Sequence, residues 1–293
     1  MKVTALLMSV MMLACAAPAG STSEPAQRRD FQERDEFNQT YQLAPGTRVE
    51  VSSIRGPVEI VNAEGATAEV KIVRAARTRA DLEHHKIEVE KTGNSLVVRG
   101  VQEPDQRHWN IQVDHHVILK LPRQIDVTVS SISGSVKVGE VDGQTTLNSI
   151  SGSVDIGNVG GKLQLNSISG NVEVGSVGAD ARLTSISGNV GLGQVDGSLD
   201  VTSVSGRVKT TVLKLSPRGI HITSVTGSIE LGFKGEVNAD FSAESINGQV
   251  TFGITNVTRD SEVKSPNVRA RIGTGGTPIT ITSVTGNIRL TQS

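Results

Sequence analysis

The sequence predicts an all-β fold, a single-domain parallel β-solenoid (β-helix) with coils of about 18 residues. The first observation is a short phrase, Ser-Ile-Ser-Gly or a close variant, that recurs through the chain. A recurrence at a fixed step near 20 residues indicates one structural unit stacked on copies of itself. The copies begin at Ser131, Ser149, Ser167, Ser185, Ser203, Ser224, Ser245 and Ser283.

The second observation is the placement of apolar residues when each copy is numbered from its serine. Positions −2, +5 and +7 hold aliphatic residues, as Leu165, Val172 and Val174 do in one copy, with variable polar residues between them. Alternation with a period of two is the strand pattern, whereas a helix would repeat apolar residues every three or four positions. Parallel coils also explain why like residues recur in register, since each coil lies over the last. We expect a right-handed winding from the chirality of parallel crossovers.

Position +1 forms a fourth aliphatic column, which we expect in the core with the other three. A charge buried in a core column is costly. We therefore expect Ile168→Asp to unfold or grossly destabilise the domain and Glu173→Ala to do little. The members of the +1 column are Ile132, Ile150, Ile168, Ile186, Val204, Val225, Ile246 and Val284.

The third observation is a composition that suits narrow, regular layers. Aromatic residues make up only 2% of the 293 residues, so Val, Ile and Leu must fill the core. The formal net charge of −1 argues against a general nucleic-acid binder, which needs clustered Lys and Arg. Cys15 is the one cysteine, so no internal disulfide is expected.

The N-terminus has the pattern of an export signal over residues 1–19. Lys2 precedes the apolar run from Val3 to Ala14, which is too short to span a bilayer as a helix. The segment Met12-Leu13-Ala14-Cys15 resembles a bacterial lipobox, which implies cleavage before Cys15 and its lipidation. Ordinary cleavage after Ala19 would instead discard Cys15.

The rest of the chain is expected to divide into a tether and one domain. Residues 20–38 are polar and charged, as a flexible tether would be, and the domain is expected over 39–293. Within it, 61–120 is expected to form irregular N-terminal strands and a cap, with a short helix near Arg79–His85. Regular coils are expected over 121–253, followed by an irregular stretch and a final coil over 254–293.

The order of these pieces resembles the bacterial family called "putative adhesin", a β-strand repeat family of unknown function. The matching residues are the phrase Val-Ser-Ser-Ile-Arg-Gly-Pro-Val-Glu-Ile at 51–60, Val117–Pro122 leading into Asp126–Val129, and the Ser-Gly coils. The segment from Gly273 to Ile288 matches the family's C-terminal end. The resemblance implies an exported or envelope-located β-solenoid and brings no catalytic residues with it.

Candidate chemistry is sparse, and no catalytic, cofactor-binding or metal-binding residue is assigned. The repeated serines are expected to point inward as a hydrogen-bonded ladder, with Asn148, Asn166, Thr184 and Thr202 forming another beside them. A nucleophilic serine would need a nearby histidine, and the chain has none between His116 and His221. The pairs His84-His85 and His115-His116 are candidates for a metal site, but adjacent strand residues point to opposite faces, so a solvated surface is preferred.

These observations favour a non-enzymatic structural or binding module of the cell envelope, adhesin-like and without cofactors. The expected location is the outer membrane, as a lipoprotein anchored through Cys15, or the periplasm. The expected partner is an envelope component or a glycan, and no nucleic acid. A carbohydrate-active β-helix enzyme and an end-to-end polymerising envelope scaffold remain the alternatives.

Overall fold

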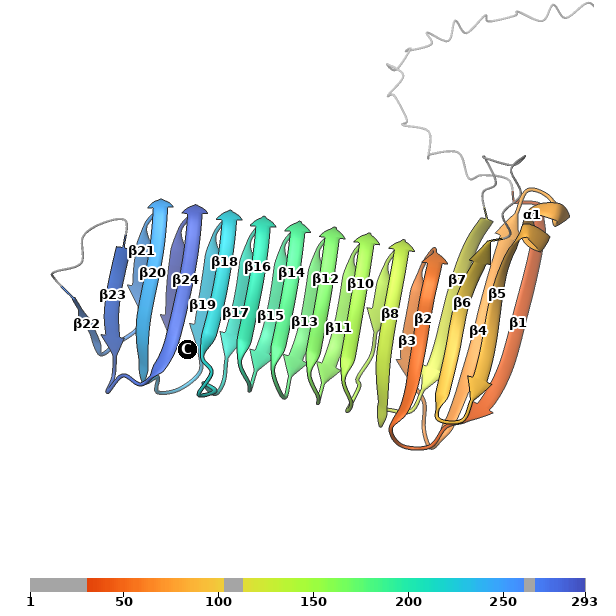
Figure 1. Cartoon of the computed structure of the whole chain (residues 1–293), viewed down its shortest axis with the longest axis horizontal. Helices are drawn as coiled ribbons and strands as arrows, with labels where there is room; N and C mark the ends of the chain where they lie inside the picture. The colour runs from red at the N-terminus through yellow and green to blue at the C-terminus, as the bar shows by residue number, and fades with distance from the viewer. Residues whose placement is uncertain (1–30, 103–112, 261–266, 293) are drawn as a thin grey trace, which may run out of the picture. The chain divides into compact units, whose positions relative to one another are not determined.

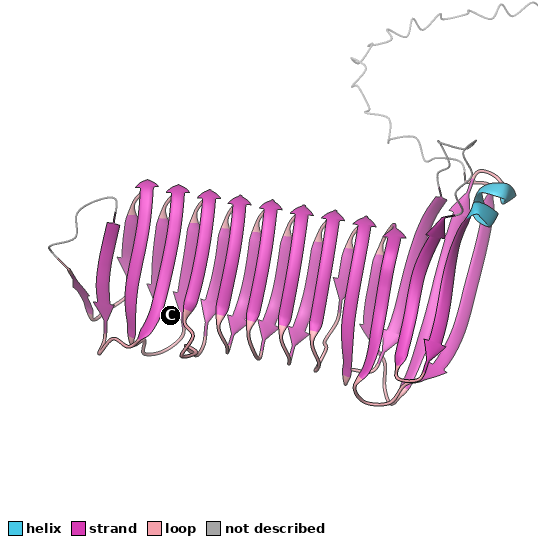
Figure 2. Cartoon of the chain, in the orientation of Figure 1, coloured by secondary structure: helices cyan, strands magenta, loops and turns pink. Residues whose placement is uncertain are grey.

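The structure is a computed structural model, which describes residues 31–102, 113–260 and 267–292. The described chain is almost entirely β-structure, with the six-residue helix α1 (Arg79–His84) beside the N-terminal strands (Figures 1 and 2). A capping box starts α1, because the Thr78 hydroxyl accepts from the Asp81 amide and the Asp81 carboxylate accepts from the Thr78 amide. Within the described ranges, no helix has the length and apolar character needed to cross a bilayer.

The strands form two long sheets. Sheet A contains, in spatial order, β1 (Glu33–Gln42), β4 (Thr67–Ala76), β7 (Val113–Leu121), β3 (Val58–Asn62), β9 (Val136–Val138), β11 (Val154–Val159), β13 (Val172–Val177), β15 (Val190–Val195), β17 (Val208–Val212), β19 (Ile229–Phe233), β25 (Ile288–Gln292) and β21 (Val250–Gly253). Sheet B contains β22 (Val257–Arg259), β23 (Asn267–Ile272), β20 (Ala239–Asn247), β24 (Thr277–Thr285), β18 (Ile220–Thr226), β16 (Leu199–Ser205), β14 (Ala181–Ser187), β12 (Leu163–Ser169), β10 (Thr145–Ser151), β8 (Ile125–Ser133), β2 (Thr47–Arg55), β6 (Ser95–Gln102) and β5 (His85–Thr92).

The regular coils stack in parallel, so the predicted solenoid is confirmed. Each coil contributes one strand to sheet B and the next to sheet A, and like residues pair between neighbouring coils. Leu147 lies beside Leu165 in sheet B, and Val154 beside Val172 in sheet A. The early copy at 49–60 is a coil of the same stack, because β2 pairs with β8 and β3 with β9. The right-handed winding stays a prediction.

The space between the two sheets is filled by aliphatic columns. Columns −2, +5 and +7 are buried in the copies from Ser131 to Ser224, as predicted, and Val250 and Phe252 of the copy at Ser245 are partly buried. Two further inward columns lie at −4 and +10; Leu163 and Val177 are their members in one coil. The coil from Leu163 to Asp180 therefore buries Leu163, Leu165, Val172, Val174 and Val177.

The prediction that the +1 column lies in the core is wrong. Its side chains lie on the outer side of sheet B, where Ile168 is 48% exposed. The physical reason is the alternation of side chains along a strand. Leu165 at −2 and Ser167 at 0 point inward, so Ile168 at +1 must point outward. The expectation that Ile168→Asp would unfold the domain assumed a buried side chain, so the structure removes its basis.

Glycine at position +3 forms the bend between the two strands of each coil. Gly170 has a φ of +122°, and a Cβ there would lie 2.2 Å from the carbonyl oxygen of Gly152 in the coil beside it. Only glycine tolerates both this backbone conformation and so close an approach. The bend therefore repeats in register with the strands.

At the N-terminal end the pairing becomes antiparallel. β1 pairs with β4, β4 with β7, and β5 with β6. The strands and the helix expected over 61–120 are present in the described part of that stretch, but the first strand begins before the expected domain boundary at residue 39. Residues 33–38, placed in the tether by the sequence analysis, lie in β1, where Glu36 forms an ion pair of 2.6 Å with Lys71 of β4. Charged residues on an edge strand hinder further pairing, although a capping role remains a prediction.

At the C-terminal end the spatial order of the coils departs from the sequence order. The last coil, β24 and β25, lies between the coil of β18 and β19 and that of β20 and β21 (Figure 1). Phe241 of β20 and Phe252 of β21 pack edge to face in the coil at the outer end of the stack, with ring centroids 5.2 Å apart. The guanidinium of Arg259 lies 4.8 Å from the centroid of the Phe252 ring. These larger side chains cover the end of the aliphatic core.

Candidate binding face

The outward +1 column is the clearest candidate site on the described surface. We call it the aliphatic ladder. Its eight side chains are 37–58% exposed, one on each of eight neighbouring strands of sheet B. At about 4.8 Å between strands, the ladder is roughly 34 Å long. In spatial order its members are Ile132, Ile150, Ile168, Ile186, Val204, Val225, Val284 and Ile246.

Small polar residues flank the aliphatic ladder on both sides. The −1 column holds Ser130, Asn148, Asn166, Thr184, Thr202, Thr223, Thr282 and Glu244. The +2 column holds Ser133, Ser151, Ser169, Ser187, Ser205, Thr226, Thr285 and Asn247. We call these three columns together the ladder face. Glu244, on the last of these strands, is its single ionisable residue.

The ladder face is held in place by the backbone beneath it. Ser149 pairs with Ser167, and Ser167 with Ser185, so each ladder side chain is fixed relative to the next by the sheet. Every ladder member is Ile or Val, whose branched Cβ restricts χ1. The Asn166 amide also donates to the Asn148 side-chain oxygen at 2.8 Å, as the expected amide ladder requires. A partner would therefore meet an ordered surface that loses little entropy on binding.

The serine column lies inward, as predicted, but the expected hydrogen-bonded ladder does not form. Ser149, Ser167, Ser185 and Ser203 are at most 2% exposed. Their hydroxyl oxygens make no hydrogen bond to described protein groups. A small side chain suits this place because the two sheets meet at the adjacent bend. Buried hydroxyls of this kind are out of reach of a substrate.

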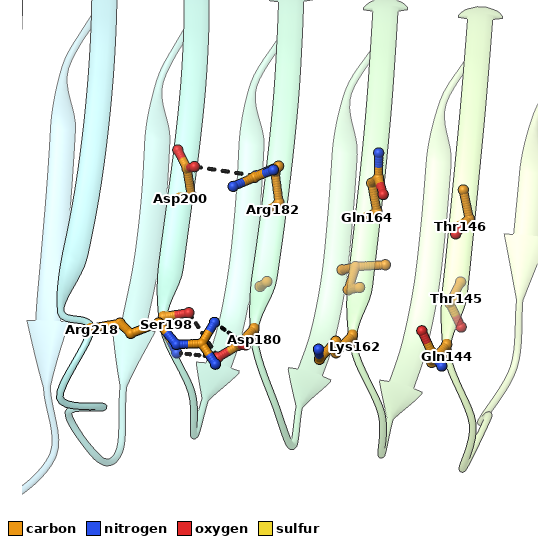
Figure 3. A pocket seen from close by; sticks show the side chains of 12 residues that line it. Gln144, Thr145, Thr146, Lys162, Gln164, Asp180, Arg182, Ser198, Asp200 and Arg218 are labelled. Atoms are coloured by element: carbon orange, nitrogen blue, oxygen red, sulfur yellow. Dashed lines mark hydrogen bonds and ion pairs between the residues drawn. The ribbon is translucent and has the colours of Figure 1, made fainter.

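A polar groove lies where the turns enter β12, β14 and β16 (Figure 3). Its volume is about 260 Å³. Asp180 accepts from the amide and hydroxyl of Ser198 at 3.1 and 2.7 Å, and pairs with Arg218 at 3.0 Å. The bonds from Ser198, and secondarily Arg218, hold the pKa of Asp180 below its usual range. Arg182 pairs with Asp200 at 3.2 Å. These charged groups bind one another, so the groove is weaker as a ligand site than the ladder face.

The two histidine pairs are placed differently from the sequence-based expectation. A solvated surface is wrong for His85 and His115, each 6% exposed, whose ring centroids lie 6.4 Å apart. His115 Nδ1 lies 3.2 Å from the Arg55 carbonyl oxygen, which can only accept, so Nδ1 carries the proton. The Nε2 atoms of both rings are buried and make no hydrogen bond to described groups. Burial lowers the pKa of both histidines, and the charge of Arg55 lowers that of His85 further.

The remaining sequence-based sites are not brought together. Within the described ranges, no set of three or more His, Cys, Asp or Glu side chains is arranged to hold a metal ion. Cys15, the predicted lipidation site, lies outside the described residues. The aliphatic ladder was in the sequence but was assigned to the wrong side of the strand. The sequence did carry a signal that one of the two columns faces outward, because adjacent residues such as Ser167 and Ile168 cannot share a face. Which of the two faces outward is decided by the packing of the sheets.

Solved structures similar to this chain include three bacterial proteins. A protein described as a putative adhesin from Bacteroides fragilis is 13% identical, with 87% of this chain and 97% of that chain covered and a TM-score of 0.48. One described as a putative cell adhesion protein from Clostridium sporogenes is 12% identical, with 89% and 100% covered and a TM-score of 0.25. One described as a putative lipid binding protein from Parabacteroides distasonis is 13% identical, with 87% and 96% covered and a TM-score of 0.38.

Among curated proteins, none matches this sequence. The comparison with protein families gives one match that spans most of the chain. The family model described as Toastrack DUF4097 covers residues 47–291, which include every coil of the stack and both strands of the early copy. This match agrees with the solenoid-like repeat architecture and with the resemblance seen in the coil phrases. The chain belongs to the Toastrack DUF4097 family.

Proposed function

We propose that this protein is a non-enzymatic binding module of the bacterial cell envelope that engages its partner through the ladder face. The observation that carries the proposal is the row of eight exposed Ile and Val side chains on one side of sheet B. A contiguous apolar patch longer than a small-molecule pocket marks an interaction surface in a soluble domain. Its regular spacing suits an extended or repeated partner surface rather than a compact ligand.

Two features support binding over catalysis. The repeated serine hydroxyls are buried inside the coils, where no substrate reaches them. Four charged groups of the polar groove are bound to one another in the Asp180–Arg218 and Arg182–Asp200 pairs. The carbohydrate-active enzyme and the end-to-end scaffold remain alternatives, and the experiment below addresses the first of them.

The envelope location rests on the sequence pattern at the N-terminus. Lys2, the apolar run to Ala14 and the lipobox-like Met12–Cys15 support export and lipidation of Cys15. A lipidated cysteine would tether the coils to a membrane surface, in the outer membrane or facing the periplasm. Mass spectrometry of the mature N-terminus tests this part: a lipid-modified Cys15 is expected, and a free start near Gly20 contradicts it.

The binding proposal is tested with two triple variants of equal charge. The ladder variant carries Ile150→Lys, Ile168→Lys and Ile186→Lys. The control variant carries Asn158→Lys, Ser176→Lys and Gln194→Lys, on the sheet A side of the same three coils. Co-sedimentation with isolated cell envelopes is expected to fall at least tenfold for the ladder variant only. Equal binding by both variants contradicts the assignment of the face, and release of soluble sugars from the envelopes would favour the enzyme alternative.

A further inference from the structure

We infer that the partner of the ladder face is the ladder face of a second copy of this chain, so that two solenoids pack sheet to sheet. The inference rests on the proposed function and names the partner of the same surface. Packed sheets lie about 10 Å apart, with the side chains of their facing surfaces interdigitated. The outer side of sheet B presents the apolar layer that such packing needs, and no described element of its own chain covers it.

Spacing is the first argument for a second copy. The ladder members stand one strand apart, at about 4.8 Å, over eight consecutive strands. A partner that fills the gaps between them along the whole row must have a rigid apolar surface with the same repeat. This chain carries such a surface, fixed by the parallel register of Ser149, Ser167 and Ser185.

Charge is the second argument. Two identical surfaces oppose like charges when they meet, which penalises self-association of a charged face. The ladder face avoids this penalty because Ser, Thr and Asn flank the aliphatic row, and its single ionisable residue, Glu244, lies on the last of the eight strands. In the central coils, Arg182 and Asp200 lie two residues before Thr184 and Thr202 of the ladder face and pair with each other at 3.2 Å.

Size is the third argument. Three columns on eight strands give the ladder face 24 residues. A standard stable interface uses roughly 20–30 residues on each side. Because the same patch serves both copies, the contact is isologous and closes as a two-fold dimer. The Ile and Val side chains are already restricted in χ1, so the dimer forms with little loss of side-chain entropy.

The test measures the mass of the full chain by sedimentation as a function of concentration, with Cys15→Ser present in every sample to prevent unrelated thiol chemistry. The protein that carries Cys15→Ser and an unchanged ladder face is expected to be a dimer at micromolar concentration. The ladder variant is expected to be monomeric to at least a hundredfold higher concentration, and the control variant with Asn158→Lys, Ser176→Lys and Gln194→Lys to remain dimeric. Circular dichroism must show that all three are folded. The inference is overturned if the protein with the unchanged ladder face is still a monomer at 100-fold higher concentration. It is also overturned if the ladder variant forms the same dimer.

Cross-linking then tests whether the faces meet along their length. Single cysteines replace Ile132 and Ile246, at the two ends of the aliphatic ladder. A short bis-maleimide is used because facing sheets lie about 10 Å apart, beyond the reach of a disulfide. Covalent dimers are expected from Ile132→Cys alone if the copies are parallel, and from its mixture with Ile246→Cys if they are antiparallel. Glu173→Cys, on sheet A, is expected to give none. No covalent dimer in either ladder sample overturns the inference.

A final arm separates this inference from the proposed function. Co-sedimentation is repeated with envelopes from cells that lack this protein. Loss of binding to those envelopes supports a second copy as the partner. Ladder-dependent binding that persists overturns the second-copy inference and leaves the envelope-binding function standing, with another envelope component as the occupant.

Discussion

The regular coils and the N-terminal end bury different kinds of side chain. Among the described residues of the coils from Ile125 to Phe233, the buried groups are aliphatic chains, the hydroxyls of Ser and Thr, and the ring of Phe233. The N-terminal end encloses two histidines, His85 and His115, between strands that pair in the antiparallel sense. The core of the coils therefore contains no ionisable side chain, whereas the N-terminal end buries two histidines that can become protonated.

A second contrast lies within a single coil, between an inward and an outward aliphatic side chain of the same strand. Leu165 and Ile168 are three residues apart, are both apolar and recur with the same period. Leu165 is 1% exposed and Ile168 is 48% exposed. Periodicity of sequence thus identifies a column, but the direction of the side chain decides whether the column stabilises the fold or faces a partner.

The largest expected effect comes from placing a charge in an inner column. Leu165→Asp is expected to abolish the cooperative melting transition or lower its midpoint drastically, because an unpaired buried carboxylate costs several kcal/mol. Ile168→Asp is expected to change stability by only about 0.5 kcal/mol, as exposed substitutions do. Thermal melting by circular dichroism measures both, with Glu173→Ala as a neutral reference. Equal loss of stability in the two Asp variants would show that the ladder is buried.

A smaller loss of folding stability is expected when the glycine of the bend between the two sheets is replaced by alanine. Gly170→Ala places a Cβ 2.2 Å from the Gly152 carbonyl oxygen at a φ of +122°. Backbone strain of this kind costs about 1–3 kcal/mol, and the clash adds to it. The matched control is Gly235→Ala, which has a φ of +91° but nothing within 4 Å of its Cβ. Urea unfolding should rank Gly170→Ala as the more destabilised variant, and the reverse order would contradict close stacking of the bends.

The smallest expected effect is a pH dependence confined to the N-terminal end. Burial lowers the pKa of His85 and His115 in the folded protein; the charges of Arg55 and His84 lower that of His85 further, and Arg74 that of His115, while Asp81 opposes the shift. Below the ordinary histidine pKa of about 6.5, the unfolded chain binds more protons. The stability of this end is therefore complete above pH 6.5 and falls as the pH decreases through the lowered pKa values.

Hydrogen-exchange protection factors, corrected for intrinsic rates, measure this effect. Between pH 7.5 and pH 5, protection is expected to fall in β5 to β7 and to hold in β12 to β16. His115→Gln should reduce the fall, and His221→Gln, an exposed residue of the regular coils, should leave it unchanged. An equal fall in protection in β5 to β7 and in β12 to β16 would contradict the proposed difference between the N-terminal end and the regular coils.

Much of the fold follows from the sequence because the constant length of the repeat fixes the register in which neighbouring strands pair. The serines at 18-residue steps align Ser149 with Ser167 and Ser185 in adjacent strands, so parallel stacking needs no long-range information. The family resemblance, the helix near Arg79 and the strands between 61 and 120 could be predicted in the same way, from local pattern. The strand at 33–42 could not, because its charged residues find partners such as Lys71 only after β4 is in place.

By itself, the sequence determined that this chain is a β-solenoid, since alternating aliphatic columns at a constant step leave few other ways to bury them. Tertiary structure alone decided three things: which side of sheet B carries Ile168, where the last coil enters the stack, and that His85 meets His115. Each depends on which surfaces remain available after neighbouring strands have paired. That is a property of the assembled sheets, and the ladder face follows from it.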